Sequence, residues 1–163
     1  MAKTVDEIIT EIIVREGGGK LVNIPGDGGG PTIWGISKRA NPDLWVNGPP
    51  TEAQARQRYF ERYVEAPGFE LIPHEALKIQ LIDFGVLSGP KKAIMELQGL
   101  LKLEADGILG PQTLSAATMS DPKWLNNQLV GARARMIGRI ISKNPSQAKF
   151  AAGWLNRATD FLV

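Results

Sequence analysis

The sequence contains no cysteine and only one histidine, His74. The absence of cysteine excludes disulfide bonds, thiol nucleophiles and thiolate metal ligands. With a single histidine, a histidine-based zinc site or a Ser-His-Asp triad is not expected. The chemistry of this chain is therefore expected to use carboxylates, hydroxyls, amides and the backbone, with no metal and no cofactor.

The sequence also has no long apolar run and no large excess of charge. No stretch approaches the roughly 18 apolar residues of a membrane span, and residues 1–15 carry acidic side chains and no apolar run of signal-peptide length. We therefore expect synthesis in the cytoplasm without a signal peptide and no stable membrane insertion. The net charge of +2 is scattered, and no basic stripe alternates with aromatic residues. Nucleic-acid binding is not expected, whereas an anionic polymer such as cell-wall material is compatible with a pI of about 9.0.

Apolar residues recur at helical spacing along most of the chain, which predicts a mainly α fold. We expect one helix to open at Thr51, and the other predicted helices cover residues 4–16, 75–87, 90–102, 111–119, 121–143 and 146–161. The segment between Gly17 and Pro50 is rich in glycine and proline and predicts a loop or short irregular strands. We divide the chain into a catalytic region, 1–92, and a helical region, 93–163. Since only Ser88-Gly89-Pro90 separates them, we expect the two regions to pack tightly as one unit.

Glu16 ends the first predicted helix and is the most informative residue. At 100° per residue it falls within about 40° of Ile9 and Ile12, on the apolar stripe, while Glu7 and Glu11 point to the opposite side. Desolvation and the negative end of the helix would both favour the protonated carboxyl group, as a general acid requires. The alternative is a glutamate whose side chain bends out to water.

Asp27 lies eleven residues later, between Gly26 and Gly28-Gly29-Gly30. Glycoside hydrolysis characteristically needs one protonated carboxyl group and one carboxylate on either side of the scissile bond. Glu16 at a helix end and Asp27 in a polar loop would supply these two environments. The alternative interpretation of Asp27 is an ordinary turn residue.

Three further residues are candidates for the same site. The hydroxyl of Thr32 could position a water molecule, and Trp34 could either stack on a sugar or anchor the loop to the core. Asp83 stands inside the apolar helix 75–87, where an unpaired charge would be very costly. It is either hydrogen-bonded for structural reasons or part of a cleft wall.

Together these residues resemble glycoside hydrolase family 108, which includes phage endolysins and prophage-derived secretion muramidases. The residues that carry the resemblance are Glu16-Gly17-Gly18, Asn23, Pro25, Asp27, Gly29-Gly30-Pro31-Thr32, Trp34-Gly35-Ile36-Ser37, Tyr59, Tyr63, Leu71-Ile72-Pro73 and Asp83-Phe84. The C-terminal half resembles the family's peptidoglycan-binding module through Leu97-Gln98, Asp106-Gly107, Gly110-Pro111, Thr113 and Gly153-Trp154-Leu155-Asn156-Arg157.

The resemblance implies a lysozyme-like helical fold with a Gly-rich active-site loop and a C-terminal helical bundle. It implies an N-acetylmuramidase that cleaves peptidoglycan glycan strands, with Glu16 catalytic. Together with the candidates above, we expect a monomer in which Glu16, Asp27 and Thr32 are catalytic and Trp34, Tyr59, Tyr63 and Asp83 bind substrate. Action in the periplasm or cell wall after release through a holin-type pore is also implied. The alternatives are a lytic transglycosylase, which needs only one acid, and a non-catalytic peptidoglycan-binding or secretion accessory protein. Retention or inversion of configuration stays open.

Overall fold

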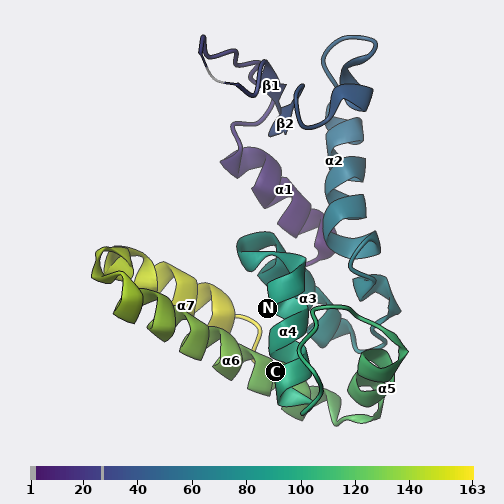
Figure 1. Cartoon of the computed structure of the whole chain (residues 1–163), viewed down its shortest axis with the longest axis vertical. Coiled ribbons are helices and arrows are strands. Elements are labelled where there is room, and N and C mark those ends of the chain that lie inside the picture. The colour runs from purple at the N-terminus through teal and green to yellow at the C-terminus, as the bar shows by residue number, and fades with distance from the viewer. Residues whose placement is uncertain (1–2, 27) are drawn as a thin grey trace.

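The computed structural model describes residues 3–26 and 28–163 and has a mainly α fold (Figure 1). The α-helices in this part of the chain are α1 (Val5–Arg15), α2 (Glu52–Phe60), α3 (Glu75–Ser88), α4 (Pro90–Leu100), α5 (Pro111–Met119), α6 (Pro122–Lys143) and α7 (Ala151–Thr159). Shorter helical turns are η1 (Pro42–Trp45), η2 (Glu61–Glu65), η3 (Phe69–Leu71) and η4 (Pro145–Phe150). The prediction of a mainly α chain is confirmed.

The first two helices begin where their capping residues predict. The side chain of Thr4 accepts a hydrogen bond from the backbone N–H of Glu7, and the Glu7 carboxylate accepts one from the backbone N–H of Thr4. Thr51 and Gln54 form the same reciprocal pair at the start of α2. Each pair satisfies backbone donors that a helix start would otherwise leave unpaired. Beyond α2 the chain continues into η2, a π-helical turn that the sequence pattern did not predict.

Helix α3 is the centre of the molecule and packs against α1, α4 and α6 (Figure 1). Its apolar residues lie on nearly all sides, and Leu77, Leu81 and Phe84 are at most 1% exposed. An apolar pattern of this kind is typical of a central, buried helix. The predicted boundary between residues 92 and 93 lies inside α4, whose residues Ala93, Ile94 and Leu97 pack in the same core as α3.

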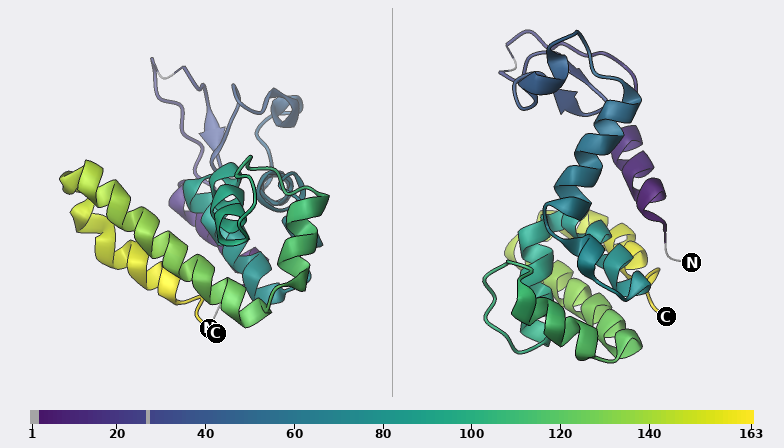
Figure 2. Two further views of the ribbon diagram at one scale, coloured as in Figure 1. Left: turned by 60° about the horizontal axis from the view of Figure 1, so that its bottom comes forward. Right: turned by 90° about the vertical axis from the view of Figure 1, so that its right-hand side faces the viewer.

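Helices α6 and α7 lie side by side as a pair that projects from the centre (Figure 2). The sequence predicted one helix over residues 146–161, but the chain forms η4 first and α7 only from Ala151. The break at Asn144 and Pro145 is where the sequence placed it, and the side chain of Asn144 accepts a hydrogen bond from the N–H of Ser146. Within the described residues, none of the helices has the length and apolar character needed to cross a membrane.

A group of charged side chains joins α3 to α6, α7 and α1. Both carboxylate oxygens of Asp83 are engaged: Oδ2 accepts a hydrogen bond of 2.6 Å from Arg133, and Oδ1 accepts bonds of 2.8 and 2.5 Å from Arg157. Arg157 also lies 3.1 Å from Glu11, whose side chain is 41% exposed. Burial lowers the pKa of Arg133, the more deeply buried of the two cations. The pKa of Arg157 is raised, because Asp83 and Glu11 together outweigh an opposing desolvation.

Candidate active site

Glu16 lies at the C-cap position of α1, and its side chain is exposed. It follows the buried residues Ile8 and Ile12 on the same stripe, but the core ends below it and 46% of its side chain faces solvent. The prediction of a desolvated carboxylate is therefore wrong for the free protein. The Arg15 guanidinium lies 3.4 Å from Glu16 Oε1.

The end of α1 has a geometry that fixes the position of Glu16. The N–H of Gly18 donates to the carbonyl of Ile13, and the N–H of Gly17 donates to the carbonyl of Val14. Both glycines have positive φ, which makes this a Schellman-type helix end. The chain therefore turns sharply away after Glu16 and leaves the carboxylate at the tip of the helix.

A hairpin faces the tip of α1. Strands β1 (Thr32–Ile33) and β2 (Ile36–Ser37) are antiparallel, and Trp34 and Gly35 form the two-residue turn between them. Both turn residues have positive φ, +56° and +75°, as type I′ hairpin turns require. Tryptophan rarely adopts this conformation, and such strain often accompanies functional sites.

Hydrogen bonds on three sides hold Trp34 in this conformation. Its backbone N–H donates to the Gly18 carbonyl at 3.0 Å, and its indole N–H donates to the Pro50 carbonyl at 3.1 Å. Its own carbonyl accepts a hydrogen bond of 2.9 Å from the Tyr59 hydroxyl. The indole ring also lies so close to Gly19 that a Cβ there would be 2.4 Å from it. Trp34 thus ties together the end of α1, the loop before α2, and α2 itself.

Gly35 brings the hairpin into direct contact with the candidate acid. A Cβ atom on Gly35 would lie 2.7 Å from Glu16 Cβ and 2.2 Å from the Tyr59 hydroxyl oxygen. The backbone therefore approaches both side chains at a distance that only glycine permits. The hairpin turn forms one wall beside the stem of Glu16.

Tyr59 supports this wall from below and is only 3% exposed. Burial, followed by the negative charge of Glu16, raises the pKa of Tyr59 to about 12. Its ring stacks on Tyr63 with centroids 6.3 Å apart and planes inclined by 16°. Glu16, Trp34 and Tyr59 are thus brought together, and Tyr63 adjoins them through the stacked rings.

Thr32 is the first residue of β1, and Ile33 separates it from the turn. Its backbone pairs with Val22 through bonds of 2.8 and 2.9 Å and is the cross-strand partner of Ser37. The Gly-rich segment is therefore tied to the hairpin at Val22. Asp27, the predicted second carboxylate, lies outside the described residues.

Asp83 is not part of this group. Its side chain is 0% exposed, and two arginines occupy both of its oxygens. The predicted substrate contact does not fit this placement, because no carboxylate oxygen is free to reach a sugar. The other interpretation, a structural hydrogen-bonded aspartate, agrees with the geometry.

Sequence reasoning missed the residues that fix Trp34. The acceptors are the backbone carbonyls of Gly18 and Pro50, which have no side-chain signature. The available signal was the Trp34-Gly35 pair between Ile33 and Ile36, since glycine in a two-residue turn between β-branched residues is typical of a hairpin.

No group of three or more His, Cys, Asp or Glu side chains that could hold a metal ion occurs in the part of the chain that the structure describes.

Comparison with known proteins gives two family matches and similar solved structures. Residues 9–89 match the model of glycosyl hydrolase 108, and residues 92–159 match that of a predicted peptidoglycan domain. The structure of Brucella abortus SagA is similar, with a TM-score of 0.65 and 25% sequence identity over 96% of this chain and 90% of that chain. No curated protein matches the chain. These matches agree with the predicted lysozyme-like helical fold.

Proposed function

The chain belongs to the glycosyl hydrolase 108 family through residues 9–89, and from this premise we propose that it is an N-acetylmuramidase with Glu16 as its proton donor. The predicted peptidoglycan domain follows at residues 92–159, so the chain is a glycosidase that acts on peptidoglycan in the cell wall. The finer assignment concerns the bond cleaved, between N-acetylmuramic acid and N-acetylglucosamine. In this proposal the protein is a monomeric, bacteriolytic enzyme of phage or prophage endolysin type.

The observation that carries this assignment is the setting of Glu16. Its carboxylate is open to solvent and to a polymer, while its stem is fixed by the end of α1 and by the close approach of Gly35. A general acid must be both accessible to the leaving group and held in position. A bound glycan would cover the carboxyl group and supply the desolvation that the free protein lacks.

The reaction requires one proton from Glu16. The carboxylic acid protonates the glycosidic oxygen as the bond to C1 of N-acetylmuramic acid breaks, and the leaving sugar departs as an alcohol. Asp27 either attacks C1 to form an ester, which water then cleaves at C1 while the Glu16 carboxylate takes the proton, or it removes a proton from a water molecule that attacks C1 directly. Thr32 positions the attacking water. Attack by water delivers OH to C1 and its proton to the carboxylate base. The configuration is retained if the carboxyl groups are about 5–5.5 Å apart and inverted at about 6.5–9.5 Å.

The aromatic residues have different parts in this proposal. Trp34 and Tyr63 are partly exposed and could stack on a sugar face. Tyr59 is buried and acts by holding the Trp34 carbonyl. Asp83 has no part in substrate binding.

The test compares purified wild type with Glu16→Gln on isolated peptidoglycan. We expect the variant to lose lysis and the release of reducing ends, with a free energy of unfolding within about 0.5 kcal/mol of wild type because the side chain is exposed. Glu7→Gln is the matched control on the same helix, since the amide keeps an acceptor for Thr4.

Lysis by a folded Glu16→Gln protein would refute the assignment. Anhydro-sugar ends in the product mass spectra would identify a transglycosylase, and wall binding without cleavage by wild type would identify an accessory protein.

A further inference from the structure

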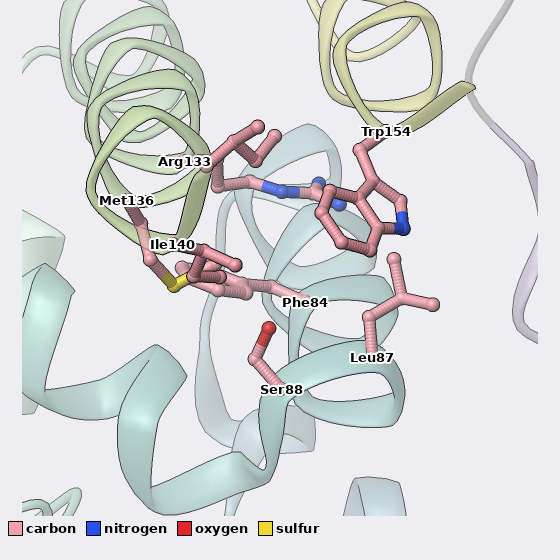
Figure 3. A pocket seen from close by; sticks show the side chains of 8 residues that line it. Phe84, Leu87, Ser88, Arg133, Met136, Ile140 and Trp154 are labelled. Carbon is pink, nitrogen blue, oxygen red and sulfur yellow. The ribbon is translucent and has the colours of Figure 1, made fainter. Parts of the chain in front are cut away.

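A hollow lies between α3, α6 and α7, apart from Glu16 (Figure 3). It begins as a cavity of about 130 Å³, roughly ten times the volume that one water molecule needs. Its lining is mostly apolar and comprises Phe84, Leu87, Ser88, Arg133, Met136, Ile137, Ile140 and Trp154. Neither Glu16 nor the Trp34 turn contributes to it.

The cavity opens into a wider and more charged groove. Leu87, Ser88, Met136 and Ile140 also line a neighbouring hollow of about 410 Å³, to which Lys92, Arg139 and Lys143 contribute. We call the two hollows together the α6 groove. Arg135, Arg139 and Lys143 recur at every fourth position, so they form one ridge along α6.

The rim of the α6 groove carries more positive than negative charge. Glu96 lies 3.0 Å from Lys92 and 3.2 Å from Arg139, so one carboxylate serves two cations. Among residues 3–26 and 28–163, no acidic side chain forms an ion pair with Lys143, which lines the groove. A ligand with carboxylates would complement this rim.

The wall of the cavity adds a further cation. Arg133 is 3% exposed and uses Nη2 on Asp83, whereas its Nη1 is buried without a hydrogen-bond partner in the part of the chain that the structure describes. Buried donors are normally paired. Arg133 Nη1 therefore offers a hydrogen-bond donor to a polar atom of a ligand that enters the cavity.

We propose that the α6 groove binds the peptide stems of peptidoglycan, with alanine side chains in the apolar cavity and carboxylates along the basic rim. The inference rests on the proposed function for the identity of the polymer. In a glycan strand that carries stems, the lactyl carboxyl group is consumed in the amide bond to the peptide, so the sugars are neutral and the negative charge lies on the stems. Only the stems combine small apolar groups with carboxylates, which are the two properties that the α6 groove offers. Most of its lining falls within the segment that matches the predicted peptidoglycan domain.

The experiment titrates the full-length protein with the free stem tetrapeptide L-Ala-γ-D-Glu-meso-diaminopimelate-D-Ala, and binding is followed by calorimetry and by NMR. We expect shifts at Leu87, Met136 and Ile140, and binding that weakens with salt. Arg139→Gln/Lys143→Gln should raise Kd about fivefold, because it removes two rim charges. Ile140→Glu should raise Kd about tenfold or more, because it places a carboxylate in the groove.

Two control variants carry the same changes elsewhere. Lys123→Gln lies on α6 about 24 Å from Arg139, at 1.5 Å per residue, and Ile108→Glu lies on an exposed loop. Both should leave Kd unchanged, and melting curves should show that all variants fold. Equal affinity in wild type and both groove variants would overturn the proposal. So would shifts at the groove produced by a neutral chito-oligosaccharide, or equally strong binding of polyphosphate.

Further measurements separate this inference from the proposed function. Glu16→Gln should abolish hydrolysis and still bind the tetrapeptide with the wild-type Kd. The groove variants should hydrolyse peptide-free glycan strands at the wild-type rate and intact peptidoglycan with a raised KM. If wild type hydrolyses peptidoglycan but does not bind the tetrapeptide, only the proposal of stem binding in the α6 groove is refuted. If it binds the tetrapeptide without hydrolysis, only the muramidase assignment is refuted.

Discussion

The hydroxyl of Tyr59 donates a hydrogen bond of 2.9 Å to the carbonyl oxygen of Trp34, and so joins α2 to the turn that packs against Glu16. The bond is partly buried and supports a residue in a strained conformation. The position of the proposed acid therefore depends on a phenol that a substrate cannot reach.

Removal of this hydroxyl should affect both stability and activity. Tyr59→Phe should lower the free energy of unfolding by about 1 kcal/mol, because the Trp34 carbonyl loses a partner. It should also lower kcat on peptidoglycan about tenfold, since the wall beside Glu16 becomes less fixed. Tyr63→Phe, which keeps the stacked ring, serves as the control for stability. Unchanged kcat in Tyr59→Phe would show that the bond does not position the site.

The titration of Tyr59 should be visible directly. Its pKa is raised to about 12 by burial and by the nearby charge of Glu16, against 10.0 for a free phenol. Below pH 10 the Tyr59 phenol is protonated in both the folded and the unfolded protein, so its contribution to the free energy of unfolding is fully present. Between pH 10 and about 12 the unfolded chain loses the proton first, so this contribution falls as the pH rises. Ultraviolet titration of the folded protein should show a phenolate component near pH 12 that Tyr59→Phe lacks; a wild type without it would contradict the prediction.

The helices could be predicted from the sequence because their signals are local. Capping pairs such as Thr4 with Glu7 and the apolar stripe of α1 are encoded within a few residues, and both are found in the structure. Helix α3 could be predicted as central and buried because its apolar residues lie on nearly all of its sides. The turn η2 and the split between η4 and α7 could not, because they are small changes of helical pitch without a distinct sequence pattern.

The site could be predicted only in part. The stripe places Glu16 on the correct face of α1, but exposure depends on where the core ends, and periodicity carries no information about that. Asp83 could be predicted to need a partner, yet its partners Arg133 and Arg157 are 50 and 74 residues away in sequence. Such long-range pairing follows from the packing of α3, α6 and α7.

The close approach at Gly35 should make this position intolerant of any side chain. Gly35→Ala should lower the free energy of unfolding by about 2–4 kcal/mol. The positive φ strains an alanine backbone, and the added Cβ overlaps with the side chains of Glu16 and Tyr59. Gly48→Ala is the matched control, because Gly48 also has positive φ but has nothing within 4 Å of the added Cβ. Chemical denaturation measures both changes. Equal losses in the two variants would show that the contact with Glu16 is loose.

The buried carboxylate of Asp83 should be structural and not catalytic. Asp83→Ala leaves Arg133 without a carboxylate partner and Arg157 with Glu11 alone, and should cost about 3–5 kcal/mol. At a temperature where the variant is still folded, its hydrolysis of glycan strands per folded molecule should equal that of wild type. A variant with wild-type stability and no activity would return Asp83 to the active site.

The last prediction concerns the dependence of the catalytic region on the C-terminal helices. A fragment of residues 1–92 ends within the first turn of α4 and lacks α6 and α7. It loses the core residues Ile94, Leu97, Leu125 and Leu129, and Asp83 loses both of its arginines. Each lost contact leaves apolar or charged surface of α3 facing water, where nothing else covers it. We therefore expect the fragment to be unfolded or aggregated by circular dichroism and size-exclusion chromatography, and to be inactive on peptidoglycan.

Addition of a separate 93–163 fragment should restore helicity and activity if the two regions share one core. A folded, active fragment on its own would show that α3 and the Glu16 site are stable without the C-terminal helices.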